Sequence, residues 1–274
     1  MRTTSAHVLL TGATGTIGAA LARRLGAQGA RVTMVARTPD VLEALADATG
    51  GAAVAADLCD PNRLRGLVDE VEAQQGPVDI LVNNAGVETS AHLTDLSAEQ
   101  LRTTLDLNLA APLELCRQVL PGMLDRGRGH LVNISSLAGV ATFPGLAAYG
   151  ASKAGLTHGT SGLRADLRGT PVRTLTVEIG PVASEMMERI NGHGPSAASF
   201  SRVLRARLLT MLDPDDVARE VVRAIEQDRP HLRLPRRAAP LAAVTGVPRA
   251  LARVALTGIP TASSTGDDRG GGGS

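Results

Sequence analysis

Short apolar runs alternate along the chain with longer segments in which apolar residues recur every three or four positions. The short runs are predicted to be buried strands, at residues 7–12, 31–37, 52–57, 79–86, 130–136 and 172–180. The longer segments predict helices at residues 17–28, 39–48, 61–75, 98–125 and 148–168. Because the short runs are apolar on both faces, we expect a mainly parallel sheet covered by helices on both sides.

The last part of the chain continues this pattern and then loses it. An acidic start and one apolar face predict a helix at residues 213–228, and HLRLP at 231–235 is the candidate for a seventh strand. We therefore expect a doubly wound, three-layer αβα sandwich with a seven-stranded sheet, forming one domain over residues 1–235. Residues 236–260 form a basic, amphipathic extension that we expect to pack on this domain or on another subunit, with a membrane-surface helix as the alternative. Residues 261–274 are predicted to be a disordered tail whose glycine-rich end resembles a synthetic linker.

Composition and charge argue against several classes of protein. The 274 residues carry a formal net charge of +1 and only 1% aromatic side chains, which speaks against a nucleic-acid partner. Cys59 and Cys116 are too few and too far apart for a disulfide framework or a zinc site, so we expect reduced thiols and no metal. No run resembles a signal peptide or reaches the length of a membrane span, so a cytoplasmic location is predicted.

A glycine-rich loop, TGATGTIG at residues 11–18, follows the first predicted strand and opens the first predicted helix. In such a loop Gly12 permits a tight turn, Gly15 lets a pyrophosphate approach the backbone, and Gly18 lets the helix pack closely. Free N–H groups at the helix start would bind the phosphates. The loop predicts a Rossmann-type dinucleotide site, and the alternative is a turn that is merely rich in glycine. The expected contacts are Gly12, Thr14, Gly15, Thr16, Ile17 and Gly18.

The second predicted strand ends in VAR, which bears on the choice of cofactor. A site that prefers NAD usually has an acidic residue there to bind the ribose 2′-hydroxyl. This chain has Arg37 instead, and a guanidinium can bind a 2′-phosphate in bidentate fashion. We therefore favour NADP(H) over NAD(H), with Arg37 as a solvated loop charge as the alternative.

The sequence contains one tyrosine, Tyr149, and one lysine, Lys153, four positions apart in a predicted helix. That spacing places the two side chains on the same helix face. A nearby cation favours the phenolate, so it would lower the tyrosine pKa toward the range in which general acid–base catalysis is efficient. The alternative is an ordinary surface pair.

With these elements placed, the chain resembles the short-chain dehydrogenase/reductase family, in its classical branch, over about residues 7–235. The motifs that carry the resemblance are DL (57–58), NNAG (83–86), LDLNLA (105–110), NISS (133–136), YGASK (149–153) and EIGPVAS (178–184). The resemblance implies a catalytic set of Asn108, Ser136, Tyr149 and Lys153. It also implies cofactor contacts by Asp57, Leu58, Asn84, Ala85, Gly86, Tyr149, Lys153, Gly180, Val182 and Ser184.

The same resemblance assigns roles within the catalytic set. The family's catalytic serine lies thirteen positions before the tyrosine, which selects Ser136 and leaves Ser135 to support the loop. Ser136 would hold the substrate oxygen, Tyr149 would transfer the proton, and Lys153 would also contact the nicotinamide ribose. Asn108 would hold a water that links Lys153 to solvent.

Two departures from the family pattern concern the glycine loop and the loop after the sixth strand, and the first of them keeps other functions open. Thr16 stands where the classical glycine pattern has its middle glycine, Gly15 comes one position early, and Ile179 replaces the usual proline. The glycine spacing resembles the extended branch, whose members include epimerases and dehydratases that recycle their cofactor. It also removes a basic residue that some NADP-dependent members carry. A non-catalytic dinucleotide-binding protein is the third alternative, and the full Asn–Ser–Tyr–Lys set favours an oxidoreductase interconverting a ketone and a secondary alcohol.

Residues 185–212 are predicted to form a lid over a small-molecule substrate. Met186, Met187 and Phe200 indicate a fairly apolar carbonyl compound, whereas the arginines at 202, 205 and 207 could bind a carrier phosphate or face water. Members of the family are commonly homotetramers or homodimers, and the helices at 98–125 and 148–168 are where such contacts usually form.

Overall fold

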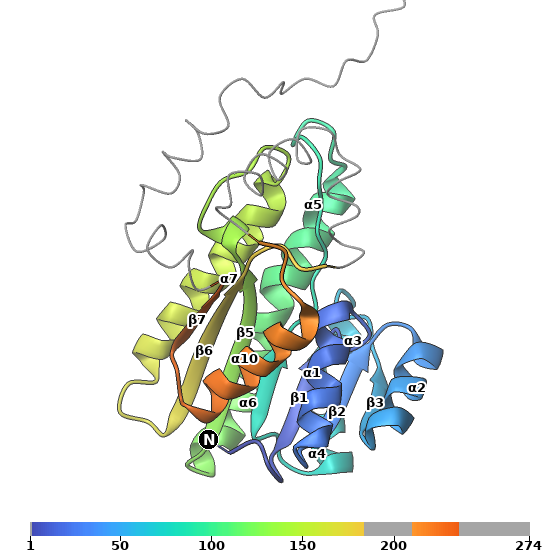
Figure 1. Cartoon of the computed structure of the whole chain (residues 1–274), viewed down its shortest axis with the longest axis vertical. Helices are drawn as coiled ribbons and strands as arrows, with labels where there is room; N and C mark the ends of the chain where they lie inside the picture. The colour runs from blue at the N-terminus through green and yellow to red at the C-terminus, as the bar shows by residue number, and fades with distance from the viewer. Residues whose placement is uncertain (1, 184–209, 236–274) are drawn as a thin grey trace, which may run out of the picture.

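The computed structural model describes residues 2–183 and 210–235 and has one seven-stranded sheet at its centre (Figure 1). The strands are β1 (His7–Thr11), β2 (Arg31–Ala36), β3 (Ala52–Ala55), β4 (Ile80–Asn83), β5 (Gly129–Ser136), β6 (Val172–Ile179) and β7 (His231–Leu234). Their order is β3-β2-β1-β4-β5-β6-β7, and every neighbouring pair is parallel. The predicted parallel sheet is therefore confirmed, including its seventh strand.

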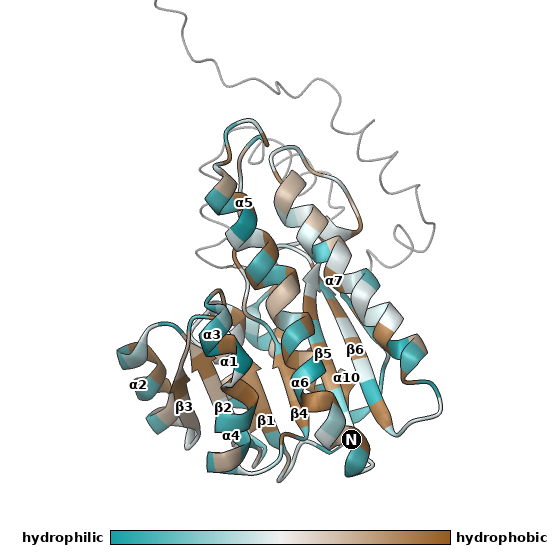
Figure 2. Ribbon diagram, turned by 180° about the vertical axis from the view of Figure 1, so that it is seen from behind, coloured by the Kyte–Doolittle hydropathy of each residue, from teal (hydrophilic) through white to brown (hydrophobic). Residues whose placement is uncertain are grey.

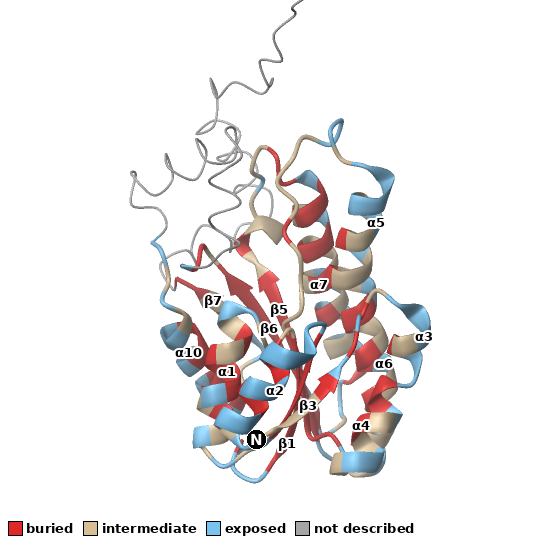
Figure 3. Cartoon of the chain, turned by 90° about the vertical axis from the view of Figure 1, so that its right-hand side faces the viewer, coloured by how far each residue is buried: buried red, intermediate tan, exposed pale blue. Residues whose placement is uncertain are grey.

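Helices cover the sheet on both faces. They are α1 (Thr16–Ala27), α2 (Pro39–Thr49), α3 (Pro61–Arg65), α4 (Leu67–Gln75), α5 (Ala98–Leu105), α6 (Ala111–Asp125), α7 (Ala147–Asp166) and α10 (Pro214–Glu226). One apolar cluster joins the sheet to α1, α2 and α10, and a second joins its other face to α3, α4 and α6. The strands are the most hydrophobic part of the ribbon (Figure 2), and the buried residues concentrate in the sheet and on the helix faces turned toward it (Figure 3). The predicted three-layer sandwich is confirmed.

Local sequence signals explain where several helices begin. Asp213 caps α10 by accepting hydrogen bonds from the N–H groups of Asp215 and Asp216. Ser97 and Gln100 form a reciprocal capping box at the start of α5. Each cap satisfies backbone donors that the first helical turn leaves unpaired.

Two predicted helices are interrupted. The segment 61–75 divides at Gly66 into α3 and α4, and the segment 98–125 contains a π-helical turn, η1 (Asp106–Ala110), between α5 and α6. A π turn accommodates one extra residue, which hydrophobic spacing does not reveal, and such turns are frequent at functional sites. Within the described residues, no helix is long and apolar enough to cross a membrane.

Candidate active site

A pocket of about 410 Å³ opens at the carboxyl ends of the strands. Its walls come from the segments that follow β1, β2, β3, β4, β5 and β6 and from α7. Parallel α/β sheets bind ligands at this edge, where strand order reverses on either side of β1. Among the predicted site residues, those lining it are Gly12, Thr14, Gly15, Thr16, Ile17, Arg37, Leu58, Asn84, Ala85, Gly86, Ser136, Tyr149, Lys153, Gly180 and Val182.

Four predicted site residues are not among the lining residues. Gly18 lies beneath the glycine loop, and Asn108 is buried behind Gly86. Asp57 is exposed after β3, and one of its carboxylate oxygens accepts a hydrogen bond of 2.9 Å from the Cys59 N–H. Ser184, most of the predicted lid, and the segments 236–260 and 261–274 lie outside the described residues.

The three glycines of the loop differ in what their surroundings require. Gly12 has a φ of +64°, and a Cβ on it would lie 2.7 Å from the Ala85 Cα. A Cβ on Gly18 would lie 2.1 Å from the Gly12 carbonyl oxygen, so α1 can approach the loop this closely only with glycine there. Gly15 has an ordinary φ of −73°, and a Cβ on it would meet only the Gly12 oxygen, at 3.4 Å. Gly12 and Gly18 are thus required for packing, whereas Gly15 leaves space at the start of α1, which no side chain caps.

The glycine loop is tied to the NNAG segment through Thr11, a residue absent from the predicted set. The Thr11 hydroxyl accepts hydrogen bonds from the N–H groups of Asn84 (3.0 Å) and Ala85 (3.1 Å). The Asn84 amide in turn donates to the carbonyl oxygens of Thr11 (3.1 Å) and Gly12 (3.0 Å). Its place as the first residue of the glycine motif was the sequence signal that could have identified Thr11 as a site residue. These bonds hold together two loops that both line the pocket.

Tyr149, Lys153 and Ser136 lie together among the residues that line the pocket. Tyr149 and Lys153 are both buried, and the Lys153 Nζ lies 6.0 Å from the centre of the phenol ring. The ammonium also donates a 3.0 Å hydrogen bond to the Ile134 carbonyl oxygen. Ser136 forms a side-chain hydrogen bond with Tyr149, and its Oγ accepts a 3.1 Å bond from the Ala138 N–H. The structure therefore brings together three of the four predicted catalytic side chains.

The electrostatics of this group differ from the sequence prediction. Burial raises the pKa of Tyr149 to about 12, although the hydrogen bond from Ser136 opposes the rise, and the charge of Glu88 adds to it. Burial lowers the pKa of Lys153 to about 8, because the charged form of lysine is the protonated one. The predicted lowering of the tyrosine pKa is wrong for this structure, because loss of hydration outweighs stabilisation of the phenolate.

Asn108, the fourth predicted catalytic residue, lies in the π turn η1 and is fully buried. Its side-chain oxygen accepts a 2.8 Å bond from the Val87 N–H, and its amide donates to the Val87 carbonyl (2.8 Å) and to the Ser152 hydroxyl (3.0 Å). A Cβ on Gly86 would lie 3.0 Å from the Asn108 oxygen and 3.3 Å from the Lys153 Nζ. Asn108 thus joins the segment after β4 to α7, directly behind Lys153.

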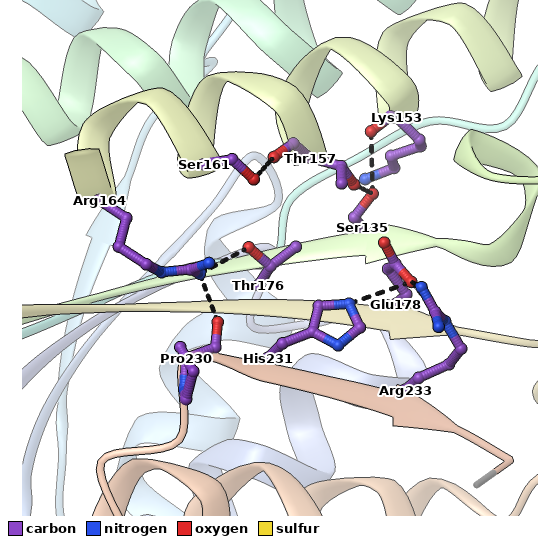
Figure 4. A network of polar contacts seen from close by, with 10 residues as sticks. All are labelled: Ser135, Lys153, Thr157, Ser161, Arg164, Thr176, Glu178, Pro230, His231 and Arg233. Atoms are coloured by element: carbon purple, nitrogen blue, oxygen red, sulfur yellow. Dashed lines mark hydrogen bonds and ion pairs between the residues drawn. The ribbon is translucent and has the colours of Figure 1, made fainter. Parts of the chain in front are cut away.

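Ser135 supports α7 (Figure 4). Its hydroxyl donates a 2.9 Å bond to the Lys153 carbonyl oxygen and lies 2.8 Å from the Thr157 hydroxyl. Ser136 instead forms a side-chain hydrogen bond with Tyr149. Ser135 was expected to support the loop, but its hydroxyl binds α7.

Apolar side chains that were not predicted form the wall beside the phenol. Phe143 and Leu146 belong to the segment before α7, and both line the pocket together with Leu137. Leu146 packs against Tyr149 in a small hydrophobic cluster. The chain has two phenylalanines, and this rarity was the sequence signal that could have marked Phe143 as a site residue.

The glycine loop, the uncapped start of α1 and the reversal of strand order define a dinucleotide-binding α/β protein. Residues 6–194 match the family described as short chain dehydrogenase. The ketoacyl reductase HetN of Nostoc sp. is 36% identical over 228 residues, which are 81% of this chain and 76% of that protein. The glycine betaine reductase ATRR of Emericella nidulans is 34% identical over 224 residues, 80% of this chain but only 17% of that much longer protein.

Solved structures agree with this result. A metagenomic short-chain oxidoreductase in complex with NADP has a TM-score of 0.67 and 32% sequence identity, and the match covers 84% of this chain and 95% of that one. The chain therefore belongs to the short-chain dehydrogenase/reductase family and is an NAD(P)-dependent oxidoreductase.

Proposed function

We propose that this protein is an NADP(H)-dependent oxidoreductase that interconverts a ketone and a secondary alcohol, with Tyr149 as the general acid and base. The observation that carries the proposal is the composition of one pocket. Tyr149, Ser136 and Lys153 line the same pocket as the glycine loop and Arg37. Proton transfer and dinucleotide binding would then occur within a single cavity.

The residues present fit a dinucleotide. The space in front of Gly15, at the uncapped start of α1, suits a pyrophosphate, because a helix N-terminus attracts anions. Gly86 brings backbone close to Asn108 and Lys153, where a side chain would not fit without displacing them. The residues that would hold the cofactor are the predicted cofactor contacts that line the pocket. By resemblance Asp57 would join them, and so would Ser184, which lies outside the described residues.

Arg37 supports NADP(H) over NAD(H). It is exposed directly after β2 and lines the pocket, and the last residue of β2 is Ala36 rather than an acid. An arginine can bind a 2′-phosphate in bidentate fashion. The related metagenomic oxidoreductase, which was solved in complex with NADP, is consistent with this choice.

The proton-transfer step uses residues of this chain. Ser136 would donate a hydrogen bond to the substrate oxygen, and the Tyr149 phenol would give that oxygen its proton during reduction. Lys153 would stabilise the resulting phenolate through its ammonium charge. When bound, the reduced nicotinamide supplies the hydride that adds to the carbonyl carbon. Asn108 would keep α7 in register with the segment after β4, and by resemblance would hold the water that links Lys153 to solvent.

The walls near Tyr149 support a fairly apolar carbonyl substrate. Leu137, Phe143 and Leu146 offer hydrophobic surface beside the phenol. The related ketoacyl reductase, by its name, also reduces a ketone, which supports the reaction class proposed here.

A second candidate function rests on the glycine spacing. With Gly15 and Thr16 at these positions, the glycine spacing resembles that of the epimerases and dehydratases of the extended branch. Those enzymes return the hydride to the same substrate and show no net use of cofactor. Oxidation of added NADPH in proportion to ketone therefore distinguishes the two candidates.

The test of the cofactor assignment is steady-state kinetics with a panel of apolar ketones, comparing NADPH with NADH. We expect the lower KM for NADPH. Arg37→Ala should raise that KM about tenfold or more and leave the KM for NADH unchanged, because a charge-assisted hydrogen bond contributes about 1.5–3 kcal/mol. Arg168→Ala, at an exposed arginine just beyond α7, is the matched control. Equal effects of Arg37→Ala on both cofactors would refute the assignment.

A further inference from the structure

An aromatic ring lies beside Tyr149 in the pocket, and the proton-transfer step described above does not use it. Phe143 and Tyr149 are the two aromatic residues in the described part of the chain, and both line the same pocket. Phe143 packs against the small cluster that Leu146 forms with Tyr149. The ring therefore stands next to the phenol that is assigned to the substrate oxygen.

Of the three apolar side chains on this wall, Phe143 keeps the largest exposed fraction. Leu137 is 8% exposed and Leu146 is 3% exposed, so both are buried within the wall, whereas Phe143 is only partly buried. A ring that lines a pocket and is not covered by the protein can contact a bound molecule. A substituent of a ketone held at Tyr149 would therefore meet the face or edge of this ring.

The backbone on both sides of Phe143 is held in place. On one side is the 3₁₀-helical turn η2 (Leu137–Gly139), where a Cβ on Gly139 would lie 2.8 Å from the backbone of α7. On the other side, the Gly145 carbonyl oxygen accepts a 2.9 Å hydrogen bond from the Ala91 N–H. The ring is thus carried by a segment that is attached to α7 at one end and to the segment after β4 at the other.

The segment that carries the ring offers no polar side chain to the pocket. Residues 140–146 have the sequence VATFPGL, and their one polar side chain, that of Thr142, is exposed and is not among the lining residues. A polar group placed against this segment would lose its hydration without gaining a side-chain hydrogen bond there. The substituent that fits beside Phe143 is therefore a hydrocarbon group.

We propose that Phe143 is a specificity-determining residue: its ring closes the space beside Tyr149 and limits the length of the hydrocarbon substituent that a ketone can place there. The inference rests on the proposed function, in which Tyr149 binds the substrate oxygen and transfers its proton. A ketone has two substituents, and the one turned toward Phe143 is the one that this limit keeps short.

The test uses symmetrical dialkyl ketones, because either orientation then places the same chain against the ring. With NADPH, kcat/KM of the wild type should fall along the series diethyl, dipropyl and dibutyl ketone. Phe143→Ala should raise the ratio of kcat/KM for dibutyl to diethyl ketone about tenfold or more, since a single methylene changes discrimination in an apolar pocket about tenfold to 200-fold. Phe143→Leu should give an intermediate ratio.

A second measurement needs no turnover. Calorimetric titration of the same ketones into the complex with NADP⁺ gives their relative affinities, and the affinity for dibutyl ketone relative to diethyl ketone should rise in Phe143→Ala. Circular dichroism and the affinity for NADPH confirm that the variants are folded and bind cofactor.

The matched control is Leu124→Ala, which removes an exposed apolar side chain from α6, outside the lining residues. Its ratios should equal those of the wild type. Unchanged ratios in both Phe143 variants would overturn the proposal, and so would an equal change for all ketones, because a ring that only shields the phenol would affect every substrate alike. A shifted binding ratio without any NADPH oxidation by the wild type would instead refute the proposed function and support the assignment of Phe143.

Discussion

At the scale of single residues, the glycines of the loop meet two different requirements, tight packing of the backbone and open space in the pocket. Gly12 and Gly18 are needed because backbone atoms occupy the space that a side chain would take. Gly15 has room for a side chain on the side that lines the pocket. Substitutions at these positions should therefore affect different properties of the protein.

We predict that Gly15→Ala leaves the fold intact, with a loss of stability of about 1 kcal/mol or less, since glycine is a better helix N-cap than alanine. Its KM for NADPH should rise because the new methyl group enters the space assigned to the pyrophosphate. Gly18→Ala should instead lower the melting temperature markedly, since its Cβ would lie 2.1 Å from the Gly12 oxygen. Thermal unfolding and cofactor titration of both variants test the distinction, and the opposite pattern would contradict it.

The residues that contact the pocket were largely predictable from short motifs at strand ends. Gly12 and Ser136 occupy such positions, Tyr149 and Lys153 form a short motif within α7, and all four line the pocket. Burial was not predictable in the same way, because it depends on segments far apart in the chain. The raised pKa of Tyr149 and the buried carboxylate of Glu88 both result from such packing.

At the scale of elements, β6 and β7 are joined by a buried ion pair (Figure 4). Glu178 is 2% exposed and accepts hydrogen bonds from the Arg233 guanidinium, including one of 2.6 Å from its Nε. The His231 Nε2 lies 3.1 Å from the same carboxylate. Burial alone would raise the pKa of Glu178, but these two partners hold it below its usual value.

Glu178→Gln should destabilise the protein by about 3 kcal/mol, because it removes the carboxylate from a buried pair while Arg233 keeps its charge. Glu114→Gln makes the same chemical change in the exposed pair with Arg117 and should cost much less, since water screens that pair. Urea unfolding at neutral pH measures both. Equal losses in the two variants would show that burial does not determine the strength of the β6–β7 pair.

Hydrophobic periodicity predicted every strand and the layer order, because strands apolar on both faces must lie between helices. It did not predict the π turn η1 or the break at Gly66. The π turn directs Asn108 inward, where it bonds to Val87 and Ser152. These partners are distant in the sequence, so a local pattern of apolar residues does not predict the turn.

At the scale of the whole molecule, the end of the sheet opposite the pocket holds a buried histidine that should make stability depend on pH. His130 is fully buried at the start of β5, and neither of its ring nitrogens has a hydrogen-bond partner among the described residues. Burial lowers its pKa to about 4, although Asp228, 3.9 Å away, opposes the shift. Between this value and its unfolded pKa of 6.5, the unfolded chain binds more protons than the folded one.

The stability that neutral His130 contributes is therefore present above pH 6.5 and lost as the pH falls toward 4. We predict a loss of about 2 kcal/mol from this residue between about pH 7 and pH 5. His130→Leu should lose correspondingly less over the same interval, whereas His158→Gln, at an exposed position on α7, should follow the wild type. Denaturant unfolding at the two pH values provides the comparison, and parallel losses in all three proteins would contradict the assignment.

The central claim is that Tyr149 transfers the proton in an NADPH-dependent carbonyl reduction. The most direct measurement is the rate of NADPH oxidation with apolar ketones, compared between the wild type and Tyr149→Phe. A binding titration first shows that the two proteins bind NADPH equally. The account predicts ketone-dependent oxidation by the wild type and a loss of about 10²–10⁴-fold in kcat for Tyr149→Phe, the range that general acid–base catalysis contributes. An unchanged kcat in the variant would contradict it.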